Sequence, residues 1–341
     1  MTRVWFNKTF SSLAAALRLI RQGDSAQQYR ILCSNTNRHA PAFLAADEHF
    51  IEPKGLLGME YAKWCLQFCA EQKIAIFVPG KEASVIANLH QEFLQVGTRV
   101  LSTASSDNLR LINDKARFCQ SLDLPLAPAA EFRAVETLAQ FDAAFEELRS
   151  RHHKLCIKPS SSVFGLGFAV LDEKRSSAEL LLEGVPYHIN LQDLRRGLEK
   201  MGAFKKMLVM EYLPGHEYSV DCVADKGRLI TAVPRRKSLI SGRGQTIDLR
   251  EDILTSAAKL AADYQLNGFF NAQFRERTQG PLGLLEINAR LSGGVAMACL
   301  AGPNLPYIGI AGFDRGFDQI EIPPIRNGIR VMEIAQATEL L

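Results

Sequence analysis

The segment from Asn271 to Gly294 constrains the fold most, because it has the pattern of two short strands joined by a turn. Apolar and polar residues alternate over Phe269–Glu276, and Thr278–Pro281 contributes the Gly and Pro typical of a turn. The second strand, Leu282–Ile287, is nearly all apolar until Glu286. A buried hairpin in this part of the chain is therefore expected.

Polar side chains gather on one face of this hairpin. Residues two apart on a strand point to the same face, so Glu286, Asn288 and Arg290 share a face that Gln273 on the neighbouring strand can join. Carboxylate and amide oxygens beside a guanidinium suit a hard cation that holds a polyphosphate. Taken alone, the segment is also compatible with an edge hairpin that exposes a surface Glu and a surface Arg.

Strand and helix patterns alternate through the first part of the chain, to about residue 122. The expected strands are Val4–Phe6, Arg30–Cys33, Glu48–Ile51, Ile74–Val78 and Arg99–Leu101, and the expected helices are Phe10–Arg21, Met59–Glu71 and Ser84–Leu94. This alternation predicts a parallel, doubly wound sheet with ligands at the carboxyl ends of its strands. Asn35–His39 and Pro79–Glu82 are therefore candidate substrate loops. The region has no G-x-G-x-x-G pattern, so a dinucleotide-binding dehydrogenase is not favoured.

Composition narrows the class of protein further. A chain of 341 residues with 47% hydrophobic content suits two or three subdomains packed as one unit. Its net charge of +3 does not indicate a nucleic-acid partner. No apolar run reaches the ~18 residues that would span a membrane, and no signal-peptide pattern is present. The seven cysteines lack a paired spacing, which indicates reduced thiols and a cytoplasmic protein.

A glycine- and serine-rich loop joins two strands in the middle of the chain. Lys158 ends the apolar strand Lys154–Pro159, where a charge needs an anionic partner. The loop that follows contains Ser160, Ser161, Ser162, Gly165 and Gly167. Small residues of this kind let backbone N–H groups approach phosphate oxygens closely. A flexible polar hairpin loop is the alternative.

Further candidates lie on expected helices and strands to either side. Lys115 lies on an expected helix, Asp107–Leu122, and other helices are expected at Val135–Ser150, His188–Met201 and Leu249–Asp263. Glu217 follows the strand Lys206–Met210 and, taken alone, is expected to be a surface strand residue. Arg235 opens the basic run Arg235–Lys237 directly after an apolar strand. That run is either a solvated loop or a source of cations for a phosphate or an acidic substrate.

Residues Leu285–Gly294 resemble the metal-binding signature of the ATP-grasp superfamily, E-x-N-x-R followed by a small, glycine-rich turn. Lys115, the Lys158 loop and the Glu211–Glu217 segment are similar to three further ATP-grasp segments and occur in the same order. Gln273 occupies the position of the first metal ligand. A glutamine at this position is similar to carbamoyl-phosphate-synthetase-like domains and standalone carboxylate–amine ligases. Proteins of this kind and size also occur in bacterial biosynthetic gene clusters, including those associated with tellurite-resistance-type stress systems. The bulky Val163 and Phe164 depart from the usual glycine-rich loop, so an altered or substrate-specific closure of this loop is expected.

The resemblance implies a mixed α/β and α+β architecture, the ATP-grasp fold. A Rossmann-like preATP-grasp domain would span residues 1–105, and two β-rich lobes that clasp ATP would span 106–190 and 191–341. The cofactors implied are ATP and one or two Mg²⁺ (or Mn²⁺) ions, and a homodimer is common in the superfamily. The residues implied to bind ATP are Lys115, Lys158, Ser160, Ser161, Ser162, Gly165, Gly167, Glu211, Tyr212, Leu213 and Glu217. Of these, Glu217 is implied to accept hydrogen bonds from the two ribose hydroxyls.

The resemblance also implies a reaction in two steps. Gln273, Glu286 and Asn288 would hold the metal ions, while Arg290 and Arg235 would offset charge on the transferred phosphoryl group. A small-molecule carboxylate would become an acyl phosphate, which an amine or another nucleophile, such as a thiol, would attack to release phosphate. The alternatives are a kinase-like or carboxyphosphate-forming enzyme and a catalytically silent ATP-binding regulator.

Overall fold

The computed structural model describes residues 1–9, 13–160, 166–240, 242 and 244–334. Its contacts divide the chain into two compact units, each assembled from segments that are distant in the sequence. Unit 1 consists of Met1–Ile112, His216–Phe274 and Glu286–Leu341, and unit 2 consists of Asn113–Gly215 and Arg275–Leu285. This division differs from the expected domains 1–105, 106–190 and 191–341.

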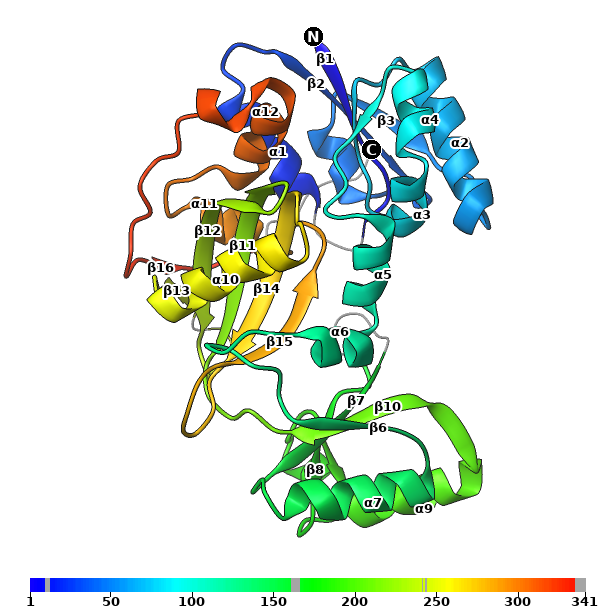
Figure 1. The fold of residues 1–341 in the computed structure, drawn as a ribbon, viewed down its shortest axis with the longest axis vertical. Coiled ribbons are helices and arrows are strands. Elements are labelled where there is room, and N and C mark those ends of the chain that lie inside the picture. Colours follow the sequence, from blue (N-terminus) through cyan, green and yellow to red (C-terminus); the bar gives the residue numbers. More distant parts are fainter. Residues whose placement is uncertain (10–12, 161–165, 241, 243, 335–341) are drawn as a thin grey trace. The chain divides into compact units, whose positions relative to one another are not determined.

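Unit 1 begins with a five-stranded parallel sheet, as the strand–helix alternation predicts (Figure 1). In spatial order its strands are β3 (Glu48–Ile51), β2 (Tyr29–Asn35), β1 (Thr2–Phe6), β4 (Ile76–Val78) and β5 (Arg99–Val100). The helical segments of this region are α1 (Leu13–Gly23), the 3₁₀ turn η1 (Pro41–Ala45), α2 (Gly58–Glu71), α3 (Ala83–Asn88) and α4 (His90–Gln95). The strand order reverses at β1, which lies between β2 and β4.

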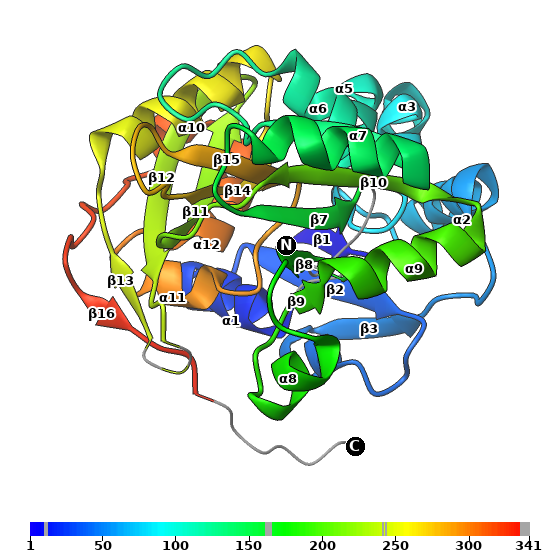
Figure 2. The ribbon, with the colours of Figure 1, turned by 90° about the horizontal axis from the view of Figure 1, so that it is seen from below.

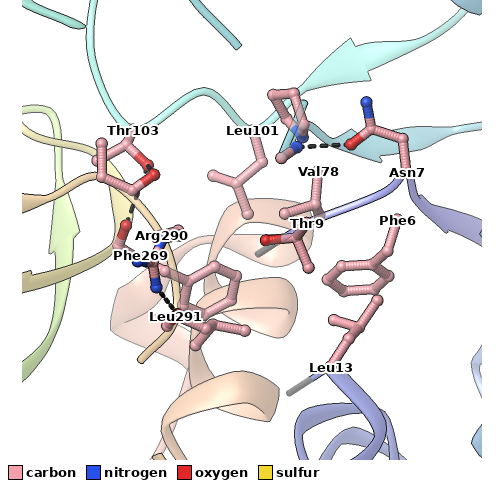
Figure 3. Close-up of a pocket in the computed structure, with 13 residues that line it drawn as sticks. Phe6, Asn7, Thr9, Leu13, Val78, Leu101, Thr103, Phe269, Arg290 and Leu291 are labelled. Atoms are coloured by element: carbon pink, nitrogen blue, oxygen red, sulfur yellow. Dashed lines mark hydrogen bonds between the residues drawn. The ribbon is translucent and has the colours of Figure 1, made fainter. Parts of the chain in front are cut away.

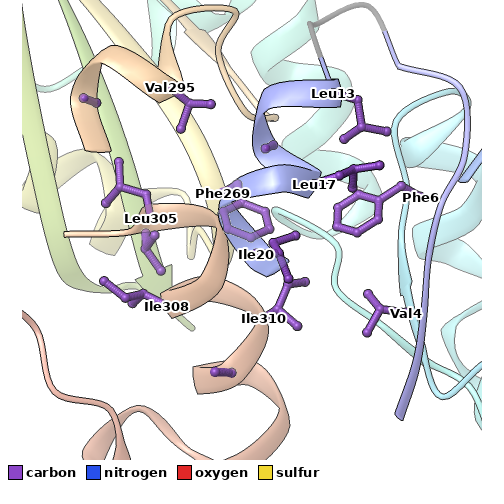
Figure 4. Packing of buried hydrophobic residues seen from close by; sticks show 14 of the residues in the cluster. Val4, Phe6, Leu13, Leu17, Ile20, Phe269, Val295, Leu305, Ile308 and Ile310 are labelled. Carbon is purple, nitrogen blue, oxygen red and sulfur yellow. The ribbon is translucent and has the colours of Figure 1, made fainter. Parts of the chain in front are cut away.

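The two faces of this sheet bury different partners. Trp5 and Phe77 stack at 4.2 Å between ring centroids, in a core that includes α2, α3 and α4. On the opposite face, Val4 and Phe6 join a core that α1 shares with α11 (Val295–Cys299) and α12 (Leu305–Arg315) from the end of the chain. Figure 4 shows Ile20 of α1 beside Ile310 of α12 and Phe269. The N-terminal sheet and the C-terminal helices therefore form one unit.

The second sheet of unit 1 has six strands. Their spatial order is β15 (Gly283–Asn288), β14 (Gly268–Arg275), β11 (Glu217–Asp225), β12 (Arg228–Lys237), β13 (Gln245–Ile247) and β16 (Arg330–Val331). The expected hairpin at residues 271–294 is present as β14 and β15, and its tip, Arg275–Leu285, has its contacts in unit 2. Helix α10 (Glu251–Asp263) packs against β12, and η2 (Phe317–Gln319) follows α12.

Unit 2 is built on a five-stranded sheet. Its strands, in spatial order, are β6 (Phe132–Thr137), β10 (Ala203–Glu211), β7 (Leu155–Pro159), β8 (Ala169–Asp172) and β9 (His188–Asn190). Helices α7 (Leu138–Arg149) and α9 (Leu191–Met201) bury Phe141 and Leu198 against one face of the sheet (Figure 2). Cys156 and Leu213 belong to a separate cluster. Because β10 pairs with β6 and β7, residues 203–211 belong to this sheet.

Several helices begin later than the pattern predicts, at side chains that cap them. The expected helix 107–122 is two helices, α5 (Ser106–Asn113) and α6 (Lys115–Ser121), and Asp114 between them accepts a hydrogen bond from the Arg117 N–H. Thr137 and Asn190 cap α7 and α9 in the same way. The residues before these helices, 135–137 and 188–190, were expected to be helical but belong to β6 and β9. The predicted helix 84–94 is likewise two helices, α3 and α4. The small helix α8 (Ser177–Leu182) follows β8.

Among the described helices, none combines the length and the apolar character needed to cross a bilayer.

Candidate functional site

Unit 2 brings the two candidate phosphate-binding lysine segments together. Lys158 is the second-last residue of β7, and Lys115 is the first residue of α6. The Lys115 N–H donates to the Ser160 carbonyl at 3.4 Å, and the Ser160 Oγ donates to Asp114 Oδ1, also at 3.4 Å. The capping residue of α6 therefore also anchors the start of the serine-rich loop.

The side chain of Cys119, on α6, lies close enough to both lysines for their charges to affect the pKa of its thiol. Burial raises the pKa of the Cys119 thiol, while the ammonium groups of Lys158 and Lys115 act in the opposite direction. Two cationic side chains from distant segments thus lie close enough to act on one group. Such a pair can hold adjacent phosphates of a nucleotide.

The loop between β7 and β8 is described only in part. Ser161, Ser162 and Gly165 lie outside the described residues, as do Val163 and Phe164. Ser160 is buried, with its N–H donating to the Lys206 carbonyl at 2.9 Å. Gly167 has a φ of +81°, and an added Cβ there would lie 2.7 Å from Pro159 Cγ. Both described ends of the loop are therefore closely packed.

The segment at the end of β10 is held by an arginine that the sequence did not single out. Arg277 Nε donates to the Glu211 carboxylate at 3.0 and 3.3 Å, and Arg277 Nη1 donates to the Leu282 carbonyl at 2.7 Å. The Tyr212 N–H donates to the Lys154 carbonyl at 3.0 Å, and Leu213 is buried. The Glu211 carboxylate is thus paired with the Arg277 guanidinium within unit 2. The hydrogen bond from the Tyr212 N–H holds the backbone of this segment in place.

The candidate metal ligands lie on β14 and β15, as alternation predicts. Asn288 Nδ2 donates to Glu286 Oε1 at 2.9 Å, and Arg290 Nη2 donates to Asn288 Oδ1 at 3.2 Å. Gln273 Nε2 donates to Asn271 Oδ1 at 3.5 Å. All four predicted side chains are half-buried. No group of three His, Cys, Asp or Glu that could hold a metal is found among the described residues, so a metal site here would depend on amide oxygens. One carboxylate with amide oxygens suits Mg²⁺, which keeps several waters.

Arg290 lies at the edge of a small cavity within unit 1. Burial lowers the pKa of its guanidinium, while the nearby Glu286 carboxylate acts in the opposite direction. The cavity measures about 30 Å³ and has mostly apolar walls, with Phe6, Val78 and Leu291 among them (Figure 3). It lies at the carboxyl ends of β1 and β4, where the strand order reverses and ligands usually bind in such sheets.

That cavity includes part of one predicted substrate loop. Pro79 and Gly80, from the candidate loop Pro79–Glu82, line it together with Asn7, whose Oδ1 accepts the Gly80 N–H at 2.5 Å. An added Cβ at Gly80 would lie 2.7 Å from both the Lys8 carbonyl oxygen and the Thr9 Cβ. No residue of the other candidate loop, Asn35–His39, lines this cavity.

Arg235 occupies a buried network, with a side chain only 3% exposed. Its Nε and Nη2 lie 2.9 and 2.8 Å from Asp221 Oδ2, its Nη1 donates to Gln245, and its Nη2 donates to Ser219 and Ser292 at 3.1 Å each. The predicted contact between Arg235 and a phosphate would need this guanidinium to leave its partners.

Glu217, the predicted ribose ligand, starts β11 and forms an ion pair with Lys237 near the end of β12. The register pairs Tyr218 with Arg236, so Glu217 and Lys237 are opposite neighbours across the two strands. Lys237, which the sequence showed only as part of a basic run, is thus the residue that holds the predicted ribose carboxylate.

These geometric features agree with the similarity of the chain to known structures. An ADP complex of N5-carboxyaminoimidazole ribonucleotide synthetase matches with a TM-score of 0.68 and 14% identity, over 96% of this chain and 80% of that one. An L-amino acid ligase from Bacillus licheniformis matches with a TM-score of 0.62 and 13% identity, over 92% of this chain and 74% of that one. The chain therefore has the fold of these ATP-grasp enzymes, and the predicted fold class is confirmed.

A more particular similarity covers the C-terminal part of the chain. Residues 203–337 match a family described as ATP-grasp in the biosynthetic pathway with Ter operon. A biotin carboxylase domain from Hydrogenobacter thermophilus, in complex with MgADP and bicarbonate, also shares the fold, with a TM-score of 0.63 and 16% identity over 91% of this chain and 70% of that one. No curated protein sequence matches the chain.

Proposed function

We propose that the protein is an ATP-dependent ligase that converts a small-molecule carboxylate into an acyl phosphate for attack by an amine or a related nucleophile. The observation that carries this proposal is the array of Glu286, Asn288 and Arg290, joined by hydrogen bonds at the end of β15 in an ATP-grasp fold. A metal ligand next to a partly buried guanidinium suits the transfer of a phosphoryl group, which depends on positioning and electrostatics.

Each group of residues then has a distinct role. Lys115 and Lys158 bind the phosphates, and the segment Glu211–Leu213 receives the adenine, with Glu217 binding the ribose hydroxyls. Glu286, Gln273 and Asn288 would hold one or two Mg²⁺ ions, which would offset the negative charge of the phosphates. Arg290 offsets the charge on the transferred phosphoryl group.

The cavity beside Arg290 supports a place for the acid substrate. Its apolar walls suit the non-reacting part of a small acid, and the Arg290 guanidinium suits the carboxylate. Its volume of about 30 Å³ leaves room for only a few atoms, so most of the substrate would lie outside it.

The test is a phosphate-release screen of paired carboxylic acids and amines, including amino acids, with products identified by mass spectrometry. We expect ADP and phosphate to form only when both an acid and a nucleophile are present. Glu286→Ala should lower turnover at least about 100-fold, because the only carboxylate ligand is lost. The exposed Glu251→Ala on α10 is the matched control. Full turnover by Glu286→Ala would contradict the metal assignment.

A carboxyphosphate-forming reaction is the second candidate, because one similar structure is a biotin carboxylase domain bound to bicarbonate. The same screen separates the two, since only this reaction would release phosphate with bicarbonate in place of the organic acid. A stable phosphorylated product without a new amide would instead indicate a kinase-like enzyme.

A further inference from the structure

Two of the three proposed metal ligands are amides, and an amide is a ligand only when its oxygen faces the cation. The orientation of Gln273 is therefore a property that the fold has to supply. Gln273 Nε2 points to Asn271 Oδ1, at 3.5 Å. With its nitrogen so directed, the Gln273 oxygen faces away from Asn271.

Asn271 is itself held in one orientation. It is 1% exposed, and its Nδ2 lies 3.1 Å from Asp221 Oδ1 and 3.0 Å from Ser219 Oγ. An ionised carboxylate can only accept hydrogen bonds, so Asn271 has to turn its nitrogen toward Asp221. The Asn271 oxygen then faces Gln273 Nε2 at 3.5 Å and also lies 3.4 Å from the Ser219 hydroxyl.

The Asp221 carboxylate forms a buried ion pair with Arg235. The two side chains are 4% and 3% exposed, and Arg235 Nη2 lies 2.8 Å from Asp221 Oδ2. A buried carboxylate is stable in its charged form only when it is paired and hydrogen-bonded. Arg235 is aligned for this contact because it lies on β12 directly opposite Ser219 on β11.

The same guanidinium also reaches the turn that follows Arg290. Arg235 Nη2 donates to Ser292 Oγ at 3.1 Å, and that oxygen accepts the Gly294 N–H at 3.1 Å. One buried cation is thus connected to both sides of the candidate metal site, to Gln273 through two side chains and to the Arg290 segment through Ser292.

We propose that Arg235 and Asp221 are positioning residues of the metal site. Through Asn271 they hold Gln273 with its amide oxygen toward the metal ion, and through Ser292 they hold the turn that follows Arg290. This inference rests on the proposed function, because Gln273 is a metal ligand only in a protein that binds a metal–nucleotide complex. It replaces the direct phosphate contact expected of Arg235 with an indirect role. Partners that orient metal ligands in this way are known to tune metal affinity strongly.

The test measures ADP binding by calorimetry, once with excess EDTA and once with saturating MgCl₂. The ratio of the ADP affinity in MgCl₂ to that in EDTA is the magnesium-dependent gain. Wild-type protein must first show tighter binding with Mg²⁺. No magnesium-dependent gain in the wild type would contradict the proposed function itself. If Mg²⁺ increases the ADP affinity of the wild type, the same measurement on the variants tests the inference.

Asn271→Ala is the decisive variant, because it removes the link to Gln273 but leaves the Arg235–Asp221 ion pair in place. We expect the magnesium-dependent gain to fall by about 10- to 100-fold, with ADP affinity in EDTA unchanged within about twofold. Asp221→Asn should reduce the gain in the same way. An unchanged gain in folded Asn271→Ala would overturn the inference.

Two further variants separate a positioning role from a general loss of stability and from direct contact with the nucleotide. Thr98→Val removes a comparable buried hydrogen bond, from Thr98 Oγ1 to the Ile74 carbonyl at 2.7 Å, and should lower thermal stability without changing the gain. Arg235→Gln should weaken ADP binding only in the presence of Mg²⁺. An equal loss in EDTA would place Arg235 on the nucleotide and contradict its role as a positioning residue.

Discussion

A single buried guanidinium explains why residue 294 is glycine. A Cβ added to Gly294 would lie 2.6 Å from Arg235 Nη1 and 2.7 Å from both Cζ and Nη2. The guanidinium cannot move aside without losing its hydrogen bonds to Asp221 and Ser219. A Cβ added to the adjacent Gly293 would have no described atom within 4 Å, so the constraint is specific to one of the two glycines.

Gly294→Ala should therefore destabilise the protein by about 1–3 kcal/mol, the usual effect of forcing an extra carbon into a packed site. The free energy of unfolding in urea measures this effect. Gly293→Ala is the matched control and should stay within about 0.5 kcal/mol of the wild type. Equal effects of the two substitutions would mean that Arg235 does not fill the space beside residue 294.

At the scale of whole elements, the start of α6 determines the position of Lys115, which we propose binds phosphate. Asp114 caps α6 through the Arg117 N–H at 3.3 Å and accepts a hydrogen bond from the Ser160 hydroxyl. A continuous helix through residue 114 would turn Lys115 to a different side, because its N–H would bond within the helix and not to Ser160. The interruption of the helix thus brings Lys115 to the end of β7.

Asp114→Ala should lower stability by about 1 kcal/mol, the typical value of a helix cap, and should weaken ADP binding with or without Mg²⁺. Asp114→Asn keeps a side-chain oxygen in the capping position and serves as the control. Thermal unfolding and calorimetry in EDTA measure the two effects. Wild-type ADP affinity in a folded Asp114→Ala protein would show that the break before α6 has no role in nucleotide binding.

Elements with a strong local pattern were predictable, whereas contacts across strands were not. The 271–294 hairpin and the parallel sheet follow from alternation within a few residues, and the structure contains both. The helix break at Asp114 was missed because the apolar spacing continues across it. The alternation that placed Gln273 also places Asn271 on the same face, so that residue could have been found. Its partner Asp221 could not, because the pairing of β11 with β12 and β14 is set only by the folded sheet.

At the scale of the whole molecule, the cysteines behave as small apolar residues. Cys33, Cys65, Cys69, Cys156 and Cys222 are buried, and Cys119 and Cys299 are partly buried. Burial raises the pKa of Cys33, Cys69, Cys156 and Cys299 to about 12. Thiols of this kind stay protonated near neutral pH, where the thiolate is the reactive form.

The folded protein should therefore react slowly with a thiol reagent at pH 8, with no more than two cysteines modified before unfolding. All seven should react in urea, which a spectrophotometric count of the released chromophore measures. Lowering the stability with Thr98→Val should speed the slow phase, because the buried thiols react through unfolded molecules. Rapid modification of more than two thiols in the native protein would contradict the buried positions of these residues.

The core that joins α1 to α11 and α12 has a consequence for the order in which a newly made chain can fold. Leu17 and Ile20 are buried in the same cluster as Ile308 and Ile310, which are synthesised much later. The first segment of unit 2, Asn113–Gly215, leaves the ribosome long before those partners exist. We therefore expect α1 to wait with its apolar face uncovered during translation, which makes the growing chain dependent on chaperones at that stage.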